Sequence, residues 1–242
     1  MKVQPIKTSR IKFGDNLENI LNGLDLSIQE GTILAITSKI ISVIEGRIIN
    51  RSEISKRDLI RREADKILIT ENSKYDLYLT IKDGLLIPSA GIDESNAGDN
   101  YILYPSDPWK SAETIWNLLR TKFKIKNLGV IITDSHTTIM RRGVSGITLS
   151  WCGFSPLYSY VNKPDIYNQP LRVTHINIID ALASSAVFVM GEGNEQTPIA
   201  LISDAPYINY LDRAPTEEEK KSVIISMEED LYAPLLLSAK WD

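Results

Sequence analysis

GVIITDSHTTIMRRG (Gly129–Gly143) places an acid, a hydroxyl and an imidazole side by side at the end of an apolar run. The run itself, LGVIIT (Leu128–Thr133), is continuous and apolar, which is typical of a buried strand. The three residues that follow it, Asp134, Ser135 and His136, allow three interpretations. These are a hydrolytic triad, a metal–phosphate site, or a polar turn after a strand. Other segments of the sequence are needed to distinguish among the three.

Other apolar runs predict strands, and capping residues predict helices between them. Strands are expected at Val3–Ile6, Thr32–Thr37 and Pro198–Ser203, and a hairpin at Leu77–Pro88 with its turn at Asp83-Gly84. Helices are expected to begin at the caps Asp15, Ser55, Asp107 (before Pro108) and Thr216, the last in a capping box with Glu219. The expected apolar side of the Ser55 helix is Ile60, Ala64, Ile67 and Leu68. The segment Thr174–Gly191 favours strand at its start and helix after it.

Hairpins and isolated buried strands occur together, without a strict alternation of strand and helix. This order indicates an α+β fold. We expect mixed, largely antiparallel sheets with flanking helices, in a single domain over residues 1–242.

The composition excludes several classes of protein. The net charge is -4 and no stripe of Lys and Arg dominates, so nucleic acid is a poor partner. The N-terminus has no apolar signal core, and the longest apolar-rich stretch, Ile176–Gly191, falls short of the roughly 20 apolar residues that a membrane span needs. The single cysteine, Cys152, has apolar flanks and fits a buried thiol in a reducing compartment. We therefore expect a cytoplasmic protein with no membrane partner.

Common catalytic motifs are absent from the sequence. There is no phosphate-binding loop of the G-x-x-x-x-G-K-[ST] type, no G-x-G-x-x-G after a strand, no H-E-x-x-H and no G-x-S-x-G. The chain has only two histidines, His136 and His175, which excludes a zinc site built on several His and Cys.

Three acid-bearing segments remain as candidates for a site: Ser89–Asn96, Thr133–Gly143 and Val189–Pro198. Each places a carboxylate at or just beyond the end of an apolar segment. The oxygen ligands that they offer are those that Mg²⁺ or Mn²⁺ prefers: Asp93, Asp134, Ser135 and Glu192. Glycines 91, 191 and 193 would let backbone N–H groups approach phosphate oxygens, and Arg141 and Arg142 could pair with negative charge. Each segment alone also fits a surface turn, and the sequence does not show that the three converge.

Seven segments, taken in order, resemble the GTP-dependent coenzyme F420-0:L-glutamate ligases (F420 gamma-glutamyl ligases). They are PIKTSRIKFGDNL (Pro5–Leu17), TSKIISVIEGR (Thr37–Arg47), SAGIDESN (Ser89–Asn96), SDPWKSAETI (Ser106–Ile115), VIITDS (Val130–Ser135) with its following RRG, DIYNQPLRVT (Asp165–Thr174) and DALASSAVFVMGEGNEQTP (Asp180–Pro198). The resemblance implies a mixed α/β structure that assembles as an intertwined homodimer. It also implies GTP as a co-substrate and two divalent cations, Mg²⁺ or Mn²⁺, with K⁺ as a further candidate ion. In the implied reaction a carboxylate of the acceptor is phosphorylated, and the amine of L-glutamate then displaces phosphate to give an amide.

The resemblance also assigns roles to residues. Asp93 and Asp134 would hold one metal ion, and Ser135 and Glu192 the other, which makes Asp93, Asp134 and Glu192 the catalytic set. The implied nucleotide contacts are Thr8, Ser9, Arg10, Ile11, Ser38, Lys39, Asn96, Met190, Gly191, Gly193, Asn194, Glu195, Gln196 and Thr197. Two cations held by carboxylates can clamp phosphates and an attacking carboxylate, and a lysine supplies a point charge on a phosphate.

The sequence departs from the family pattern at several places. Val43 stands where the pattern has a second lysine, HTTIM (136–140) replaces a Gly-Arg-Pro-type run, and Tyr167-Asn168-Gln169 replaces Tyr-Gly-Arg. Alternatives to coenzyme F420-0 or F420-1 as acceptor are therefore a folate-like molecule or a glutamyl peptide, or a non-catalytic relative that only binds nucleotide or metal. A hydrolase using Ser135 and His136 is disfavoured, because adjacent residues on a strand point to opposite faces.

Overall fold

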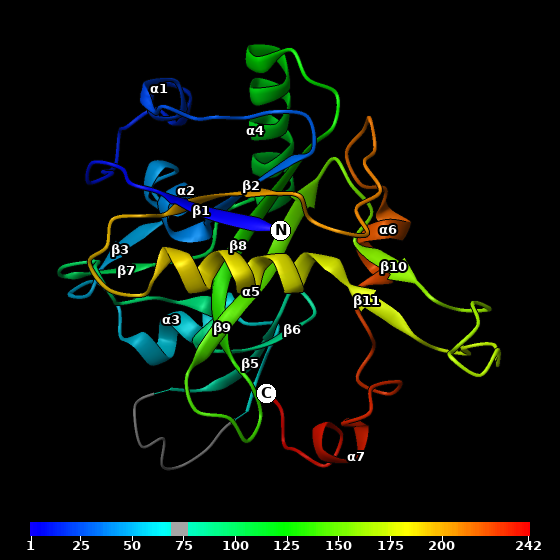
Figure 1. Ribbon diagram of the computed structural model, residues 1–242. Helices are drawn as coiled ribbons and strands as arrows, with labels where there is room; N and C mark the ends of the chain where they lie inside the picture. The colour runs from blue at the N-terminus through cyan, green and yellow to red at the C-terminus, as the bar shows by residue number, and fades with distance from the viewer. Residues whose placement is uncertain (69–76) are drawn as a thin grey trace.

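A five-stranded sheet forms the centre of the computed structural model, which describes residues 1–68 and 77–242 (Figure 1). Its strands, in spatial order, are β1 (Lys2–Ile6), β12 (Ile199–Ser203), β2 (Thr32–Thr37), β8 (Leu128–Thr137) and β9 (Val144–Cys152). Strands β2 and β8 run parallel, whereas the other three neighbouring pairs are antiparallel. The sheet is therefore mixed and mostly antiparallel.

Helices cover both faces of this sheet. The core on one face takes buried residues from α1 (Leu17–Gly23), α2 (Ser38–Ile44) and α4 (Pro108–Phe123), and the core on the other face takes them from α5 (Ile178–Met190). In β2 the side chains alternate, so that Leu34 belongs to the first core and Ile33 to the second. This arrangement explains why the central strands are apolar without interruption.

Smaller units flank the central sheet. They are the three-stranded sheet of β4 (Lys66–Ile67), β5 (Leu79–Lys82) and β6 (Leu85–Pro88), and the strand pairs β3 (Ile48–Asn50) with β7 (Asn100–Ile102) and β10 (Leu157–Ser159) with β11 (His175–Asn177). The short helices are α3 (Lys56–Glu63), η1 (Ser89–Gly91), α6 (Glu217–Ser222) and α7 (Ala233–Leu236). Within residues 1–68 and 77–242, no helix is long and apolar enough to cross a membrane.

The α+β prediction is confirmed, and so are most of the elements. The expected hairpin is β5–β6, with positive φ at Asp83 (52°) and Gly84 (78°). The segment Thr174–Gly191 divides as its composition indicated, into β11 and α5. Cys152 is buried at the end of β9, which agrees with its apolar flanks.

Two helix predictions were wrong in detail. The cap of α1 is Asn16, whose side chain accepts the N–H of Asn19, while the Asp15 carboxylate accepts the N–H of Lys12 in the preceding turn. Ser55 does cap α3, but the helix ends at Glu63 because the backbone at Ala64 is extended. Ile67 then pairs with Thr80 in the small sheet, so its burial reflects strand packing and not a helical face.

The capping box of α6 provides a test of stability against pH. The Arg213 guanidinium, followed by the Thr216 N–H, lowers the pKa of Glu219 from 4.5 to about 2. A lowered pKa in the folded state contributes stability that is present above the unfolded pKa and is lost as the pH falls toward 2. We expect Glu219→Gln, which keeps the capping geometry, to cost about 1 kcal/mol at pH 7.

The measurement is chemical denaturation of both proteins between pH 7 and pH 3. The difference in unfolding free energy should shrink as the pH falls below 4.5, the ordinary pKa of the glutamate carboxyl. A difference that stays constant over this range would contradict the role of the Glu219 charge.

Candidate active site

A pocket of about 810 Å³ lies where the ends of four central strands meet. Because β2 and β8 are parallel, their carboxyl ends lie side by side, with Thr37 opposite Thr133. Strand β12 begins at the same edge, where Pro198 O accepts the N–H of Thr37. Strand β1 ends there too, and Thr8 N–H donates to Gln196 O. The sheet topology thus brings segments that are far apart in the sequence to one place.

The pocket contains nearly all of the residues expected to form the site. Its lining includes Thr8, Ser9, Arg10, Ile11, Lys39, Asp93, Asn96, Asp134, Ser135 and every residue from Met190 to Thr197. Ser38 is the exception, because its side chain is buried and is not part of the lining. Arg141 and Arg142 are exposed at the tip of the β8–β9 hairpin and do not line the pocket.

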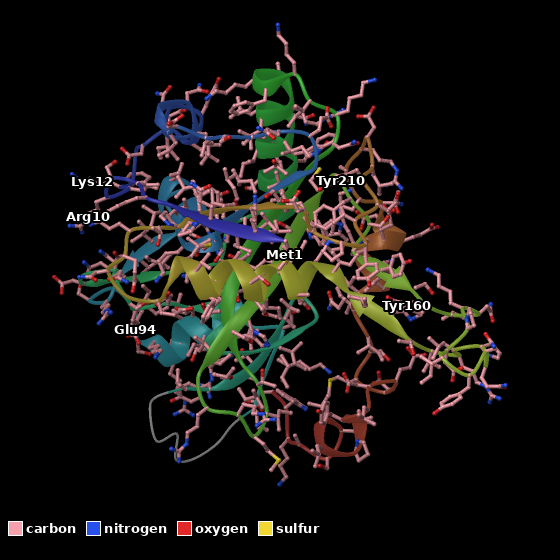
Figure 2. All side chains as sticks on the ribbon, viewed as in Figure 1. Met1, Arg10, Lys12, Glu94, Tyr160 and Tyr210 are labelled. Carbon is pink, nitrogen blue, oxygen red and sulfur yellow. The ribbon has the colours of Figure 1, made fainter. Side chains whose placement is uncertain are left out.

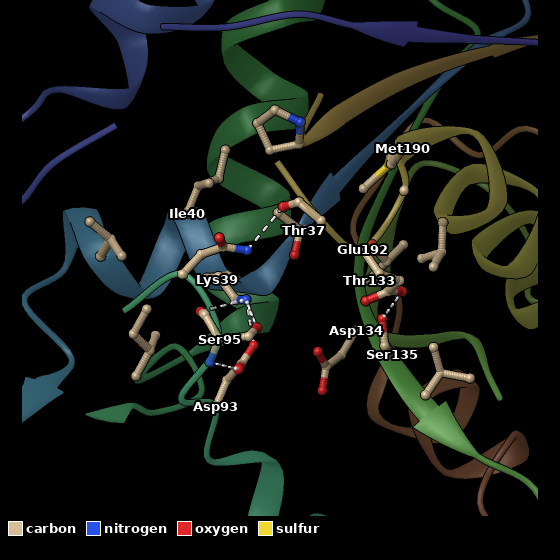
Figure 3. A pocket seen from close by; sticks show the side chains of 18 of the residues that line it. Thr37, Lys39, Ile40, Asp93, Ser95, Thr133, Asp134, Ser135, Met190 and Glu192 are labelled. Carbon is tan, nitrogen blue, oxygen red and sulfur yellow. Dashed lines mark hydrogen bonds and ion pairs between the residues drawn. The ribbon is translucent and has the colours of Figure 1, made fainter. Parts of the chain in front are cut away.

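Asp134 lies at the point where β8 leaves the central sheet. β2 ends opposite Thr133, and beyond it β8 pairs with β9 alone; the register of this pairing shifts between Ile132 and Thr133. Such a bulge redirects side chains, and both Asp134 and the adjacent Ser135 line the pocket. Figure 3 shows the Asp134 carboxylate directed across the pocket toward Asp93.

The environment of Asp134 favours its protonated form. Burial is the main reason that the pKa of Asp134 rises to about 6, and the negative charge of Asp93 adds to this rise. The hydroxyl of Tyr104 donates to Asp134 Oδ2 at 2.6 Å, which opposes the rise. A cation bound beside this carboxylate would favour the ionised form.

Asp93 forms an ion pair with a lysine on the same side of the pocket. Lys39 Nζ lies 2.5 Å from Asp93 Oδ2 and also donates to Ser95 Oγ and Ser95 O (Figure 3). The N–H of Ser95 donates to Asp93 Oδ1 at 2.6 Å. Lys39 therefore places its positive charge beside a carboxylate that lines the pocket.

Ser135 and Glu192 form the second pair, with Ser135 Oγ donating to Glu192 Oε1 at 2.6 Å. The His136 ring has a different partner, since its Nδ1 lies 3.1 Å from Ser145 O. The pairing of Ser135 with a carboxylate, and of His136 with a backbone carbonyl, gives no support to a hydrolytic triad. The tip of the hairpin, Ile139-Met140, is a turn, so the turn interpretation holds for that part of the segment.

Two of the glycines make close local contacts. Gly193 N–H donates to Glu195 Oε2 at 2.8 Å, so a carboxylate of the same loop occupies this donor. Gly91 lies against the ring of Tyr104, where a Cβ would be 2.1 Å from Tyr104 Cζ. The approach of these glycines to phosphate stays a prediction.

The donor set suits divalent cations that share their ligands with a substrate. Within the described ranges, no group of three or more His, Cys, Asp or Glu side chains is close enough to hold a metal ion. The oxygen donors instead face the pocket as two pairs, Asp93 with Asp134 and Ser135 with Glu192. Mg²⁺ usually binds through one or two carboxylates and completes its shell with water and substrate phosphates, so pairs of this kind fit it.

Two residues of the site were not singled out from the sequence. Ser95 lies within a segment that was, but Tyr104 belongs to no motif, and its contact with Asp134 spans 30 residues. Val43 lines the pocket together with other apolar residues, Ile40, Ile87, Ile92 and Ile102. The pocket lining is thus partly apolar and partly charged.

The chain belongs to the F420-0:gamma-glutamyl ligase family, whose model matches residues 5–204. The match includes every residue that lines the pocket. Among its relatives is the coenzyme F420:L-glutamate ligase of Methanopyrus kandleri, 28% identical over 252 aligned residues that cover 96% of this chain and 97% of the relative. The enzymes of the same name from Methanocaldococcus jannaschii and Archaeoglobus fulgidus are 31% and 30% identical over 74% and 79% of this chain, and over 77% and 82% of their own lengths.

Alanine substitutions at Gly91 and at another glycine separate the free-energy cost of a steric clash from the cost of backbone strain. Gly91 (φ +70°) and Gly98 (φ +63°) share a left-handed backbone, but a Cβ on Gly98 would have no neighbour within 4 Å. We expect Gly98→Ala to cost about 1 kcal/mol through strain alone. Gly91→Ala should cost about 1–3 kcal/mol more, because the ring of Tyr104 must move.

Thermal and chemical unfolding of the two variants would measure this difference. Equal destabilisation of both would show that the ring of Tyr104 does not press on Gly91 in solution.

Proposed function

We propose that this protein is a ligase that adds L-glutamate to a carboxylate of coenzyme F420, with F420-0 or F420-1 as the acceptor. GTP is the proposed co-substrate, and the reaction proceeds through an acyl phosphate that the amine of glutamate attacks. The single observation that supports this proposal best is the convergence of Asp93, Asp134, Ser135 and Glu192 in one pocket of a chain that belongs to this family.

Asp93 and Asp134 would hold one divalent cation, and Ser135 and Glu192 a second. When bound, such cations neutralise phosphate charge and orient the groups that react. The remaining steps depend on the chain itself. Phosphoryl transfer needs positioning and charge neutralisation more than covalent help from a protein, and Lys39 supplies a positive charge within reach of a phosphate.

The mixed lining of the pocket suits the two parts of a nucleotide. Phosphates fit Lys39 and the carboxylates that would hold cations. A planar ring fits the apolar lining residues, among them Val43. Asn96 cross-links the loops at the pocket, donating from Nδ2 to Gly193 O at 3.0 Å. This contact would hold the Met190–Thr197 loop in place over a bound nucleotide.

Specific residues favour an alternative acceptor. Val43, the HTTIM run and Tyr167-Asn168-Gln169 differ from the family pattern. A glutamate ligase acting on a folate-like acceptor or a glutamyl peptide would keep the carboxylates and change these positions. A relative that binds nucleotide and metal without turnover is the remaining alternative.

A substrate panel tests the reaction and the acceptor together. The purified chain is incubated with L-glutamate, Mg²⁺ or Mn²⁺, GTP or ATP, and F420-0, F420-1, a folate or a glutamyl peptide. We expect a mass increase of one glutamyl group on an F420 acceptor, with release of phosphate from GTP. Addition to another acceptor alone would support the alternative ligase, and tight nucleotide binding without any product would support the non-catalytic relative.

Asp134→Asn tests the proposed metal site. The amide keeps an oxygen that can accept from Tyr104 Oη, so the fold should be retained. We expect Mn²⁺ binding to weaken by about 10-fold or more and glutamyl transfer to be lost, because a ligand charge is removed. Mn²⁺ binding can be followed by the electron paramagnetic resonance signal of the free ion, and an unchanged affinity would remove Asp134 from the site.

A homodimer is also part of the proposal. The β10–β11 arm projects from the body of the molecule (Figure 1), and the loop at its end exposes Ile166, Tyr167 and Val173. Apolar side chains on a projecting arm suit burial against a second copy of the chain. We expect sedimentation analysis to give twice the chain mass of 27.2 kDa, and Ile166→Asp to shift the mass toward the monomer. A monomer in the unmodified protein would contradict the dimer.

A further inference from the structure

The turn that leads into Asp93 has an unusual backbone. Three consecutive residues of η1 have positive φ: Ser89 (52°), Ala90 (53°) and Gly91 (70°). For Ser89 and Ala90 this left-handed conformation is unfavourable, and both are buried. The turn is held by Ser89 N–H donating to Tyr78 O at 2.6 Å and by Ala90 N–H donating to Thr80 Oγ1 at 2.7 Å. Backbone strain that is maintained beside a pocket in this way points to a role for the turn in positioning the residues around it.

The left-handed turn carries the chain onto the ring of Tyr104. The Cα of Gly91 lies so close to this ring that a Cβ would be 2.1 Å from Cζ. Tyr104 is itself buried, and its backbone carbonyl accepts from Arg47 Nε at 3.0 Å. The ring is therefore fixed from both sides, by the turn and by the segment that carries it.

The same short segment also positions both carboxylates. Asp93 and Ile102 exchange two backbone hydrogen bonds, each 2.9 Å long. Two residues further along, the hydroxyl of Tyr104 donates to Asp134 Oδ2 at 2.6 Å. Asp93 is thus held through its backbone and Asp134 through its side chain, and both are held by residues 102–104.

We propose that Tyr104 is a positioning residue, which fixes the carboxylate of Asp134 at a set distance and orientation from Asp93 so that the two can share a cation. This inference rests on the proposed metal site. The Tyr104 hydroxyl donates to Oδ2 of Asp134, which leaves Oδ1 of the same carboxylate to coordinate the cation. Without the hydroxyl, the carboxylate can rotate, and part of the binding free energy is spent on ordering it. Groups that orient a metal ligand in this way typically change affinity by about 10- to 100-fold when they are removed.

The test uses Tyr104→Phe, which keeps the ring against Gly91 and removes only the hydroxyl. Tyr210→Phe is a matched control, because it removes a partly buried hydroxyl that donates to Gly31 O, also at 2.6 Å. Figure 2 shows Tyr210 on the other side of the molecule from Arg10, which lines the pocket. Mn²⁺ alone is the probe, titrated into each full-length protein and followed by electron paramagnetic resonance, and thermal unfolding is recorded in parallel.

We expect Tyr104→Phe to weaken Mn²⁺ binding by about 10-fold or more, and Tyr210→Phe to leave it unchanged. Both variants should unfold at similar temperatures. If the unmodified protein and Tyr104→Phe bind Mn²⁺ equally well, the positioning role is overturned while the proposed metal site stands. If both hydroxyl variants lose affinity to the same extent, the effect is one of general stability and the role is also overturned. If the unmodified protein binds no Mn²⁺, the metal site fails and this inference fails with it.

Discussion

The parallel pairing of β2 with β8 is the constraint on which the rest of the structure depends. In a sheet that is otherwise antiparallel, it places the carboxyl ends of two buried strands next to each other, with Thr37 opposite Thr133. The residues that follow these ends are the lysine of α2 and the acid–hydroxyl pair of β8. Since β12 is antiparallel to both β1 and β2, it begins at the edge where those two strands end, and the connecting loops reach the same place. A single choice of strand direction thus gathers the polar groups of the pocket.

Much of this fold could be predicted from short sequence patterns, because such patterns reflect the burial of a strand and the capping of a helix. Thr32–Thr37 is buried on both faces and reads as an uninterrupted apolar run, and Asp107 before Pro108 marks the start of α4. The failures occur where distant contacts overrule local preference. Ile67 fits the spacing of a helical face, yet it pairs with β5 in the small sheet. Asp15 is a good cap residue, but its neighbour Asn16 takes that position while Asp15 closes the preceding turn.

The pocket residues also divide into those that local patterns predict and those that distant contacts determine. The residues around the carboxylates could be predicted because charged side chains at the ends of apolar runs are informative, and the family resemblance assigned them roles. Tyr104 could not, since a tyrosine 30 residues from its partner carries no local signal. Ser38 differs in another way, because the resemblance implies a nucleotide contact there while its side chain is buried outside the pocket lining. Sequence patterns therefore identified the segments that carry polar groups, whereas their convergence in one pocket is seen only in the structure.

The pairing of Lys39 with Asp93 has a consequence for how the pocket is filled. Two carboxylates that face each other repel, and the ammonium of Lys39 already offsets that repulsion. A divalent cation that binds Asp93 must compete with this ammonium, so that binding is an exchange of one positive charge for another. If a cation displaced it, the ammonium would remain tethered to α2 and could pair with a phosphate bound to that cation. Binding of the cation and binding of the phosphate would then favour each other.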